Sequence, residues 1–508
     1  MRQRKRRRGQ GKDTAVQKIE KITQPLSKVP VYDFLTEDQL QQVHDKSMQI
    51  LEEAGIAFLY DEAQEILKQH GVKVVDDVAY FDRELVMEYL AKAPEQFTWS
   101  ARNPEHDVQI GGKYACFAPV AGPPFVVERE YGRRPSQHKD LINFLKLSQM
   151  NPYIHTSGTE ICVSSDVPIA FRHLEAMLAH FQYSDKPHMG IYHTGLTGMD
   201  SINMTKIVHG EEAVREKHYL NCIVNVSSPR RLDDRMLSLL IGYAQNNQIV
   251  CVTPFILSGA MGPVSILGTV AQLNAEAIAG IVFAQMVNAG TPCIYGSFQA
   301  VVDLQSGAPV FGAPESQLAL YISGQLARYY GIPFRAAGSY ASSKIIDAQA
   351  AYEGVMSMFP SMLVQPNFVL HAAGWLEAGL TAGYEKFILD CEQLGMYATY
   401  LNGVNWDEDQ WAMDAIVNEV PPGGHHLGTS HTMRHYKTAF YRADLFDYDS
   451  GEAWLANGSV DAYERANSKY KKLLKEYEQP TLDPAIKEAL RHYIEERKTV
   501  LDAAAIVG

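Results

Sequence analysis

The 508-residue chain has only six cysteines, scattered along the sequence and without a CxxC pair. Three of them begin apolar runs, where a thiol acts as a small core side chain. A chain of this length buries enough apolar surface to fold without cross-links. We therefore expect neither disulfides nor a cysteine metal cluster, and the cysteine usage predicts a reduced, cytoplasmic protein.

Long apolar runs and excess positive charge are also missing. No stretch of about 20 apolar residues stands out, so we expect no membrane span. The formal net charge is −13, which argues against nucleic acid as a main partner. The exception is a basic leader over residues 1–31, in which Arg2–Lys12 is the most basic part. We interpret it as a solvated, disordered tail rather than a nucleic-acid or membrane anchor.

The nucleotide-binding fingerprints GxGxxG and GxxxxGK[ST] are absent as well. Present instead is a rhythm of helical patterns and short apolar or β-branched runs that end in Gly, Ser, Thr or His. The seven runs are Ile154–Gly158, Met189–Thr194, Cys222–Ser227, Val250–Ser258, Cys293–Ser297, Phe334–Gly338 and Phe368–His371. Strands alternating with helices predict a parallel sheet.

Seven or eight such units favour a (β/α)₈ TIM barrel over a doubly wound sheet. The eighth strand is open, near Met396–Leu401 or His425–Leu427. We expect the barrel over residues 139–430, after an N-terminal α+β decoration over residues 32–138. In that decoration the run Ala115–Arg129, followed by Tyr131 and Gly132, resembles a hairpin. A C-terminal helical extension should follow over residues 431–508. Thr36 and Gln39 form a capping box that predicts the first helix.

Several motifs resemble one known family. They include Leu257-Ser-Gly-Ala-Met-Gly-Pro-Val-Ser265, Tyr295-Gly-Ser297, Ala337-Gly-Ser-Tyr340, Ala373-Gly-Trp-Leu-Glu377 and Gly423-Gly-His-His-Leu-Gly428, with Ala101-Arg-Asn-Pro104 and Gly132-Arg-Arg134 nearer the N-terminus. Together they resemble the trimethylamine methyltransferases over nearly the whole chain after residue 32.

One departure from that family concerns the substrate. Members that act on trimethylamine carry pyrrolysine directly after this Gly-Ser, whereas this chain has Tyr340. The chain resembles the non-pyrrolysine branch, which implies methyl transfer from a quaternary amine such as glycine betaine. The resemblance implies a corrinoid acceptor. Because no DxHxxG-type signature occurs in the chain, we expect a separate cognate corrinoid protein to carry it.

The predicted strand ends supply candidates for binding a betaine. A quaternary ammonium is held by aromatic faces, and the motif puts Tyr340 at such an end as a catalytic candidate. The further aromatic candidates are Tyr192, Phe255, Phe298 and Trp375. For each of these, filling the core is an open alternative.

Three polar residues complete the candidates. Arg335 lies within a strand, where a charged side chain needs an anionic partner, either a betaine carboxylate or a structural Asp or Glu. His371 ends the neighbouring strand and is a second carboxylate donor, or a satisfied core histidine. Glu276, inside an otherwise apolar helix, is the second catalytic candidate.

Four histidines lie close together: His425, His426, His431 and His435. His431 and His435 have the i, i+4 spacing of zinc ligands on a helix. No cysteine or acidic residue nearby completes a set, and a quaternary amine has no lone pair for zinc, so we expect no metal.

Two other functions remain open. A non-catalytic betaine-binding protein would have the aromatic residues without acting on a corrinoid protein. A different barrel enzyme, such as a lyase, would be indicated by metal dependence. A symmetric homo-oligomer is the usual expectation for such a chain.

Overall fold

The computed structural model describes residue 22 and residues 24–501. Most of the predicted basic leader therefore lies outside the described residues. The described part of this segment, residues 24–31, contacts the body: Leu26 forms a β-bridge with Tyr114, and the Lys28 backbone N–H donates to the Leu401 carbonyl. At these residues the segment is held by the body, contrary to the expectation of a solvated tail up to residue 31.

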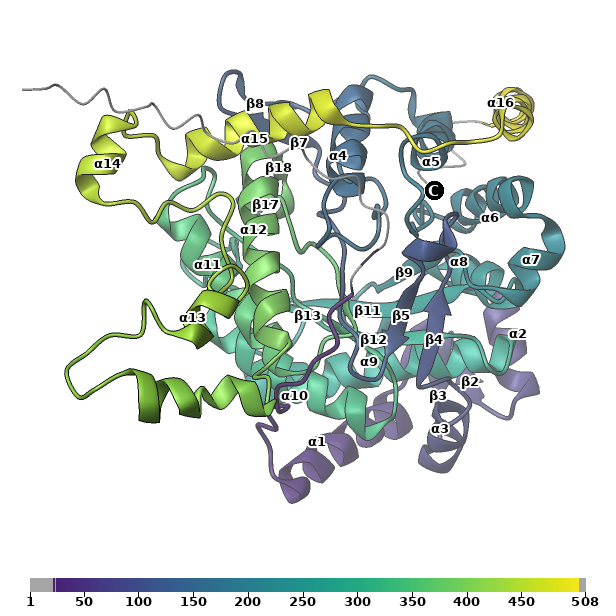
Figure 1. Cartoon of the computed structure of the whole chain (residues 1–508). Helices are drawn as coiled ribbons and strands as arrows, with labels where there is room; N and C mark the ends of the chain where they lie inside the picture. The colour runs from purple at the N-terminus through teal and green to yellow at the C-terminus, as the bar shows by residue number, and fades with distance from the viewer. Residues whose placement is uncertain (1–21, 23, 502–508) are drawn as a thin grey trace, which may run out of the picture.

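The chain folds as a mixed α/β structure around a sheet whose inner strands are all parallel (Figure 1). Five of these strands are in runs predicted from the sequence, and a sixth, β6, is not. They lie in the order β9 (Asn221–Val226), β11 (Ile249–Ser258), β12 (Cys293–Gly296), β15 (Phe334–Ala336), β16 (Phe368–Val369), β6 (Cys116–Phe117). β13 (Phe298–Val302) and β14 (Pro309–Val310) extend the sheet beyond β11.

The missing strand is β6, and both predicted positions for it are wrong. Met396–Leu401 lies in helix α12, and His425–Leu427 has no strand. β6 falls within the segment predicted as the N-terminal decoration, so the boundary at residue 138 does not follow the sheet. Two residues are too short a run for a period of two to be recognised in sequence.

The first two predicted runs, Ile154–Gly158 and Met189–Thr194, are not strands, but their backbones lie between β6 and β9. The His155 N–H donates to the Phe117 carbonyl at 2.9 Å, and the Ser157 N–H to the Pro187 carbonyl at 2.9 Å. The Gly190 N–H donates to the Asn221 carbonyl of β9 at 3.1 Å. Backbone hydrogen bonds therefore lead from β6 through both runs to β9.

The strand register assigns Arg335 to one face of the sheet. Cys251 pairs with Ile294, Gly296 with Arg335, and Arg335 with Phe368. Because paired residues point to the same side of a sheet and alternate residues share a face, these side chains lie together. The hairpin of β4 (Gln96–Trp99) and β5 (Val108–Gly111) packs on this same apolar cluster.

Helices cover the other face. They are α4 (His138–Gln149), α5 (Arg172–Tyr183), α6 (Gly195–His209), α7 (Glu211–Glu216), α8 (Asp234–Gln245), α9 (Ile266–Val287), α10 (Pro314–Tyr329), α11 (Ala348–Leu363) and α12 (Tyr384–Leu401). By length and composition α9 is apolar enough to cross a membrane, contrary to the expectation that no such run exists. It is almost wholly buried between the sheet, α1, α3, α8 and α10, as expected of a core helix.

The N-terminal part is α+β, as predicted. The Thr36–Gln39 capping box begins α1 (Glu37–Gln49) and is confirmed. The other elements are β1 (Ile56–Phe58), α2 (Asp61–Gln69), β2 (Lys73–Val75), β3 (Val78–Tyr80) and α3 (Arg83–Leu90). β1 pairs with β10 (Arg231–Leu232), which ties this part to the segment after β9.

A second small sheet stands beside the main one. The hairpin predicted from Ala115–Arg129 with Tyr131 and Gly132 is formed by the last part of that segment. Its strands are β7 (Phe125–Glu128) and β8 (Gly132–Pro135). β7 pairs with β18 (Thr381–Gly383), which pairs with β17 (Trp375–Leu376). This sheet therefore fixes the backbone that carries Trp375.

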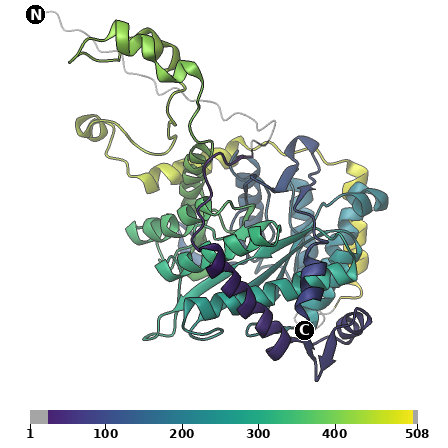
Figure 2. The same ribbon diagram turned by 90° about the horizontal axis from the view of Figure 1, so that it is seen from below.

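The C-terminal region is helical, as expected, with α13 (Ser430–His435), α14 (Gly451–Ala456), α15 (Ala462–Glu476) and α16 (Pro484–Lys498). α15 packs along α12, and α16 packs on α6, where Arg497 forms an ion pair with Asp200. Between α12 and α14 the chain leaves the body and returns (Figure 2).

Candidate active site

Aromatic side chains from separate segments meet beyond the carboxyl ends of β12, β15 and β16. The ring of Phe298 lies 5.1 Å from that of Tyr340 and 6.2 Å from that of Trp375 (centroid distances). Tyr340 is 5.0 Å from Trp375, and the His371 ring is 4.6 Å from Trp375. Sequence reasoning selected all four of these residues, and the structure brings them together.

Two further rings contact this aromatic cluster. The ring of Phe255, a predicted residue on β11, lies 4.7 Å from that of Phe298 and contacts the cluster through that ring alone. Phe311, which sequence reasoning missed, lies 5.6 Å from Tyr340 and 5.4 Å from Trp375. The available signal was an aromatic residue directly before Gly312 and two residues after Pro309, where a turn is expected. Its backbone N–H donates to Ser342 Oγ, which ties it to the loop of Tyr340.

Arg335 lies under the cluster and is 1% exposed. Its guanidinium stands over the Phe298 ring at 4.9 Å and donates one hydrogen bond, to the Ser297 carbonyl at 2.9 Å. Its Nε is buried without a partner, and in the described part of the chain no carboxylate is paired with it. Among the described residues, Arg335 therefore does not form the structural ion pair that was the alternative. A buried guanidinium with so few partners needs an anion.

His371 is held as a neutral donor. Its Nδ1 accepts a hydrogen bond from the Ala121 backbone N–H at 3.1 Å, so a neutral ring carries its proton on Nε2. Burial, and then the charge of Arg335, hold the pKa of His371 well below the usual value. The ring therefore stays neutral at physiological pH and has an Nε2–H to donate.

Other polar atoms in this region are buried without partners. They include Tyr340 Oη and Trp375 Nε1. A small cavity adjoins the cluster, lined by Phe298, Phe311, Tyr340, Ser297, Gln299, Ser316 and Gln317 among others. Arg335, His371 and Trp375 are not among the residues that line it.

Helix α12 braces the loops that carry Tyr340 and Trp375. Asp390 accepts hydrogen bonds from Ser339 Oγ at 3.0 Å and from the Gly374 backbone N–H at 2.8 Å. Lys386 Nζ lies 2.5 Å from the same carboxylate. Because Ser339 precedes Tyr340 and Gly374 precedes Trp375, this one buried ion pair positions both aromatic residues.

Tyr192 lies on the inner face of the sheet, in the apolar cluster that also contains Cys251 and Phe368. It has no ring contact with the aromatic cluster. Burial raises the pKa of Tyr192, and the charge of Arg335 opposes that rise, so the two side chains are close enough to interact. Beside it, Glu160 accepts a hydrogen bond from His193 and keeps its second oxygen buried without a partner, a feature that sequence reasoning missed.

Glu276 does not join this group. Its carboxylate accepts hydrogen bonds from Ser228 Oγ, the Arg230 backbone N–H and Gln272. Burial raises the pKa of Glu276, and those hydrogen bonds oppose the rise. These contacts hold the loop after β9 to α9, so Glu276 has a structural role rather than the expected catalytic one.

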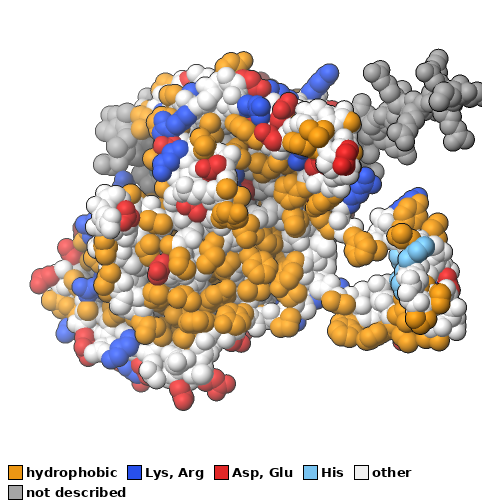
Figure 3. All heavy atoms as spheres, turned by 90° about the vertical axis from the view of Figure 1, so that its left-hand side faces the viewer, with side chains coloured by type: hydrophobic (Ala, Val, Ile, Leu, Met, Phe, Trp, Pro, Cys, Tyr) orange, Lys and Arg blue, Asp and Glu red, His pale blue; other side chains and the backbone are white. Residues whose placement is uncertain are grey.

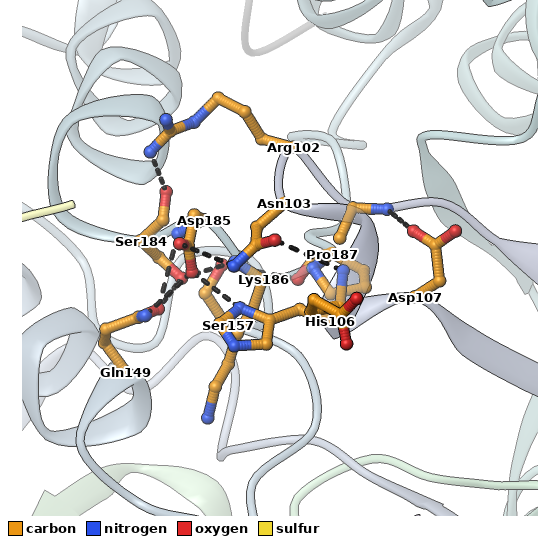
Figure 4. Close-up of polar contacts among 12 residues, drawn as sticks. Arg102, Asn103, His106, Asp107, Gln149, Ser157, Ser184, Asp185, Lys186 and Pro187 are labelled. Carbon is orange, nitrogen blue, oxygen red and sulfur yellow. Dashed lines mark hydrogen bonds and ion pairs between the residues drawn. The ribbon is translucent and has the colours of Figure 1, made fainter. Parts of the chain in front are cut away.

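The family motif near residue 101 also has structural contacts. Asp185 accepts hydrogen bonds from His106 Nδ1 at 2.7 Å and from Gln149 at 2.8 Å, with Asn103 beside them (Figure 4). Burial raises the pKa of Asp185, but these contacts outweigh it and lower the pKa to about 2. Figure 4 shows these side chains directed at Asp185, which joins the motif to the segment before residue 187.

The histidine cluster has an acidic neighbour that the sequence did not reveal. Asp409, distant in sequence, lies with His431 and His435, and their potential ligand atoms are within 4.8 Å of one another. The expectation that no acidic residue completes the set is therefore wrong. The carboxylate already pairs with Arg434 at 2.7 Å and with His435 at 2.5 Å. His425 and His426 are exposed and lie outside this group.

We predict that the methyl transfer implied by the family resemblance survives prolonged treatment of the purified protein with EDTA. The aromatic cluster and Arg335 include no metal-ligand set among the described residues, and Asp409 already pairs with the Arg434 guanidinium. The measurement is the initial rate before and after chelation, with metal content determined by elemental analysis. Stoichiometric zinc whose removal abolishes activity would contradict this prediction.

Comparisons with known proteins assign the chain to one family. The chain matches the family described as trimethylamine methyltransferase over residues 2–502, and it belongs to that family. The glycine betaine methyltransferase of Desulfitobacterium hafniense (strain Y51) is 40% identical over 470 residues, covering 92% of this chain and 98% of that protein. A proline betaine:corrinoid methyltransferase of Eubacterium limosum is 28% identical over 485 residues, with 92% and 98% covered.

Among solved structures, the monomethylamine methyltransferase of Methanosarcina barkeri superimposes with a TM-score of 0.51. The match covers 88% of each chain at 10% sequence identity. At that identity the likeness concerns the fold alone.

Proposed function

We propose that this protein transfers a methyl group from a quaternary amine, glycine betaine or a related betaine, to the Co(I) corrinoid of a separate cognate corrinoid protein. The observation that carries the proposal is Arg335, a buried guanidinium without a carboxylate partner directly beneath an aromatic cluster. A betaine has the two matching halves, an anionic carboxylate and a cationic trimethylated nitrogen.

Each half has its own partners. The carboxylate accepts hydrogen bonds from Arg335 and from Nε2–H of His371, which the neutral ring has available. The ammonium lies against the faces of Phe298, Tyr340 and Trp375, since a quaternary nitrogen offers no hydrogen and is held by aromatic electron density. The buried setting strengthens both interactions, because water does not compete.

The chemistry then needs no acid. When the carbon–nitrogen bond breaks, its electron pair returns to the nitrogen, which leaves as a neutral tertiary amine, and the methyl group bonds to cobalt. Trimethylamine as a free base would instead leave as an amide anion. Without pyrrolysine, the chain has no group at the position of Tyr340 that forms a covalent bond to such a substrate. What remains for the protein is to bind and orient the reactants.

We propose that the sheet closes into a (β/α)₈ barrel. The backbone hydrogen bonds from β6 through residues 154–158 and 187–190 to β9 support this closure. The substrate would then enter at the carboxyl ends of the strands, where barrel enzymes carry out their chemistry. We also propose that the protein acts in the cytoplasm.

The testing experiment is incubation with reduced corrinoid protein and a panel of betaines, with the cobalt absorption spectrum as readout. We expect Co(I) to be replaced by methyl–Co(III) with at least one betaine, and no change when the enzyme is omitted. Calorimetric binding of betaines without any cobalt change would indicate a non-catalytic betaine-binding protein instead.

A further inference from the structure

Residues 402–440, called the arm below, leave the body after α12 and return beside it (Figure 2). The large apolar side chains of the arm are exposed rather than packed. The exposed fractions are 75% for Trp406, 68% for Val417, 78% for Leu427 and 89% for Phe440. Met413, Ile416, Met433 and Tyr436 are also more than half exposed. Soluble monomers rarely expose apolar surface on this scale.

The arm nevertheless has a defined shape. Its outgoing and returning halves are joined by the ion pairs of Asp409 with Arg434 and His435, and by Glu419, which accepts from the Ser430 backbone N–H at 2.8 Å. At its base, Tyr441 Oη donates to Glu392 of α12. Polar contacts thus fix the arm internally while its apolar side chains face outward.

A second apolar surface lies on the body, called the α11–α12 face below. Tyr352, Val355, Met356 and Phe359 have the i, i+3, i+4, i+7 spacing of one side of a helix, a side that usually faces a protein core. Here they are 74%, 43%, 40% and 38% exposed. Phe359 continues this surface to Tyr400 of α12, with the rings 5.5 Å apart, and Met396 and Tyr400 are each 41% exposed.

Figure 3 shows hydrophobic side chains on this side of the body and on the arm, which stands apart across an open gap. The α11–α12 face bears almost no charge, since α11 contains Glu353 as its single ionisable side chain besides Tyr352. Both surfaces therefore lack a partner among the residues that the structure describes, and both lie near the base of the arm.

We propose that these two surfaces bind each other between two copies of this chain, so that the arm of each copy covers the α11–α12 face of the other. In a dimer with two-fold symmetry, both arms and both α11–α12 faces are buried at once, as in an isologous interface. A partner that binds only during turnover would leave them exposed in the free enzyme, whereas a second copy is always present. Because polar contacts already fix the shape of the arm in the single chain, less conformational entropy is lost when it binds.

The first test is the mass of the purified protein in sedimentation equilibrium. The chain has a mass of 56.7 kDa, and we expect a dimer or a multiple of it. Val417→Glu in the arm and Tyr352→Glu in the face should each give monomers at micromolar concentration, because a buried unpaired carboxylate disfavours association. The matched control is Tyr131→Glu, which changes a 75% exposed tyrosine in the turn between β7 and β8 and should leave the mass unchanged.

The second test remains informative if a charged variant fails to fold. All six native cysteines are buried, so single cysteines can be introduced. Co-expressed Leu427→Cys and Tyr352→Cys chains should form a covalent dimer with a short bismaleimide, and each variant alone should not. A monomeric wild type, or a dimer that does not cross-link in this way, overturns the proposal.

The third test removes the arm. The arm leaves α12 at Leu401, and the returning chain contacts α12 near Gly395 through Tyr441. These two points are six helical residues apart, which corresponds to about 9 Å along the helix. A short Gly–Ser linker can therefore replace residues 404–438, and we expect a folded monomer. A deletion variant that stays dimeric but loses methyl transfer would make the arm a docking element for the corrinoid protein, and would overturn the proposal.

Discussion

Replacing Arg335 by alanine is expected to weaken the binding of glycine betaine roughly 10- to 150-fold. The removed guanidinium is buried, has one hydrogen bond to the Ser297 carbonyl and keeps its Nε without a partner. Hydrogen bonds to charged groups contribute about 1.5–3 kcal/mol, which corresponds to that range of affinities. The measurement is isothermal titration calorimetry on both proteins.

Two controls separate carboxylate recognition from a structural role of Arg335. Choline has the same ammonium but no carboxylate, so it should bind weakly to the wild type and change little in the variant. Arg335→Lys keeps the charge but loses the planar fork, and should also weaken glycine betaine. If Arg335→Ala weakens choline and glycine betaine equally, Arg335 is structural and the carboxylate assignment is wrong.

Tyr340→Leu is expected to weaken glycine betaine about 2- to 30-fold, since one aromatic face contributes about 0.5–2 kcal/mol to the binding of a cation. Tyr340→Phe keeps the ring and removes only the hydroxyl, which has no hydrogen-bond partner in the structure, so it is the matched control. It should bind nearly as well as the wild type.

A neutral ligand of the same shape isolates the cation–π contribution. In 3,3-dimethylbutanoate a carbon replaces the quaternary nitrogen while the carboxylate remains. The wild type should prefer glycine betaine over this ligand, and Tyr340→Leu should reduce that preference. An unchanged preference would mean that Tyr340 fills space without contributing to recognition of the charge.

Local pattern predicted much of this structure. The runs at Cys222, Val250, Cys293, Phe334 and Phe368 contain strands, whereas the runs at Ile154 and Met189, with the same sequence pattern, are irregular backbone between β6 and β9. β6 was missed because its two residues have no periodicity, and its strand character comes only from pairing with β16. Glu276 was misjudged because its partners at Ser228 and Arg230 are distant in sequence.

The site residues divide in the same way, into those that a local sequence pattern indicates and those that only long-range contacts define. Tyr340, His371 and Trp375 were found because each follows a predicted strand or belongs to a family motif. Phe311 follows β14, a strand of two residues that is too short to be recognised in sequence, and Glu160 lies in irregular backbone two residues after the predicted run Ile154–Gly158. The pairing of Asp409 with His435 joins residues on the two halves of the arm, which no local pattern reveals.

The measurement that bears most directly on the account is a comparison of glycine betaine with trimethylamine under identical conditions. Reduced corrinoid protein is mixed with the enzyme and each amine, and the cobalt spectrum is followed with the released amine quantified. With Tyr340 in the position of pyrrolysine, the account predicts one methyl–Co(III) and one dimethylglycine per glycine betaine consumed, and no methyl–cobalt from trimethylamine. Methylation of cobalt from trimethylamine at a comparable rate would contradict it.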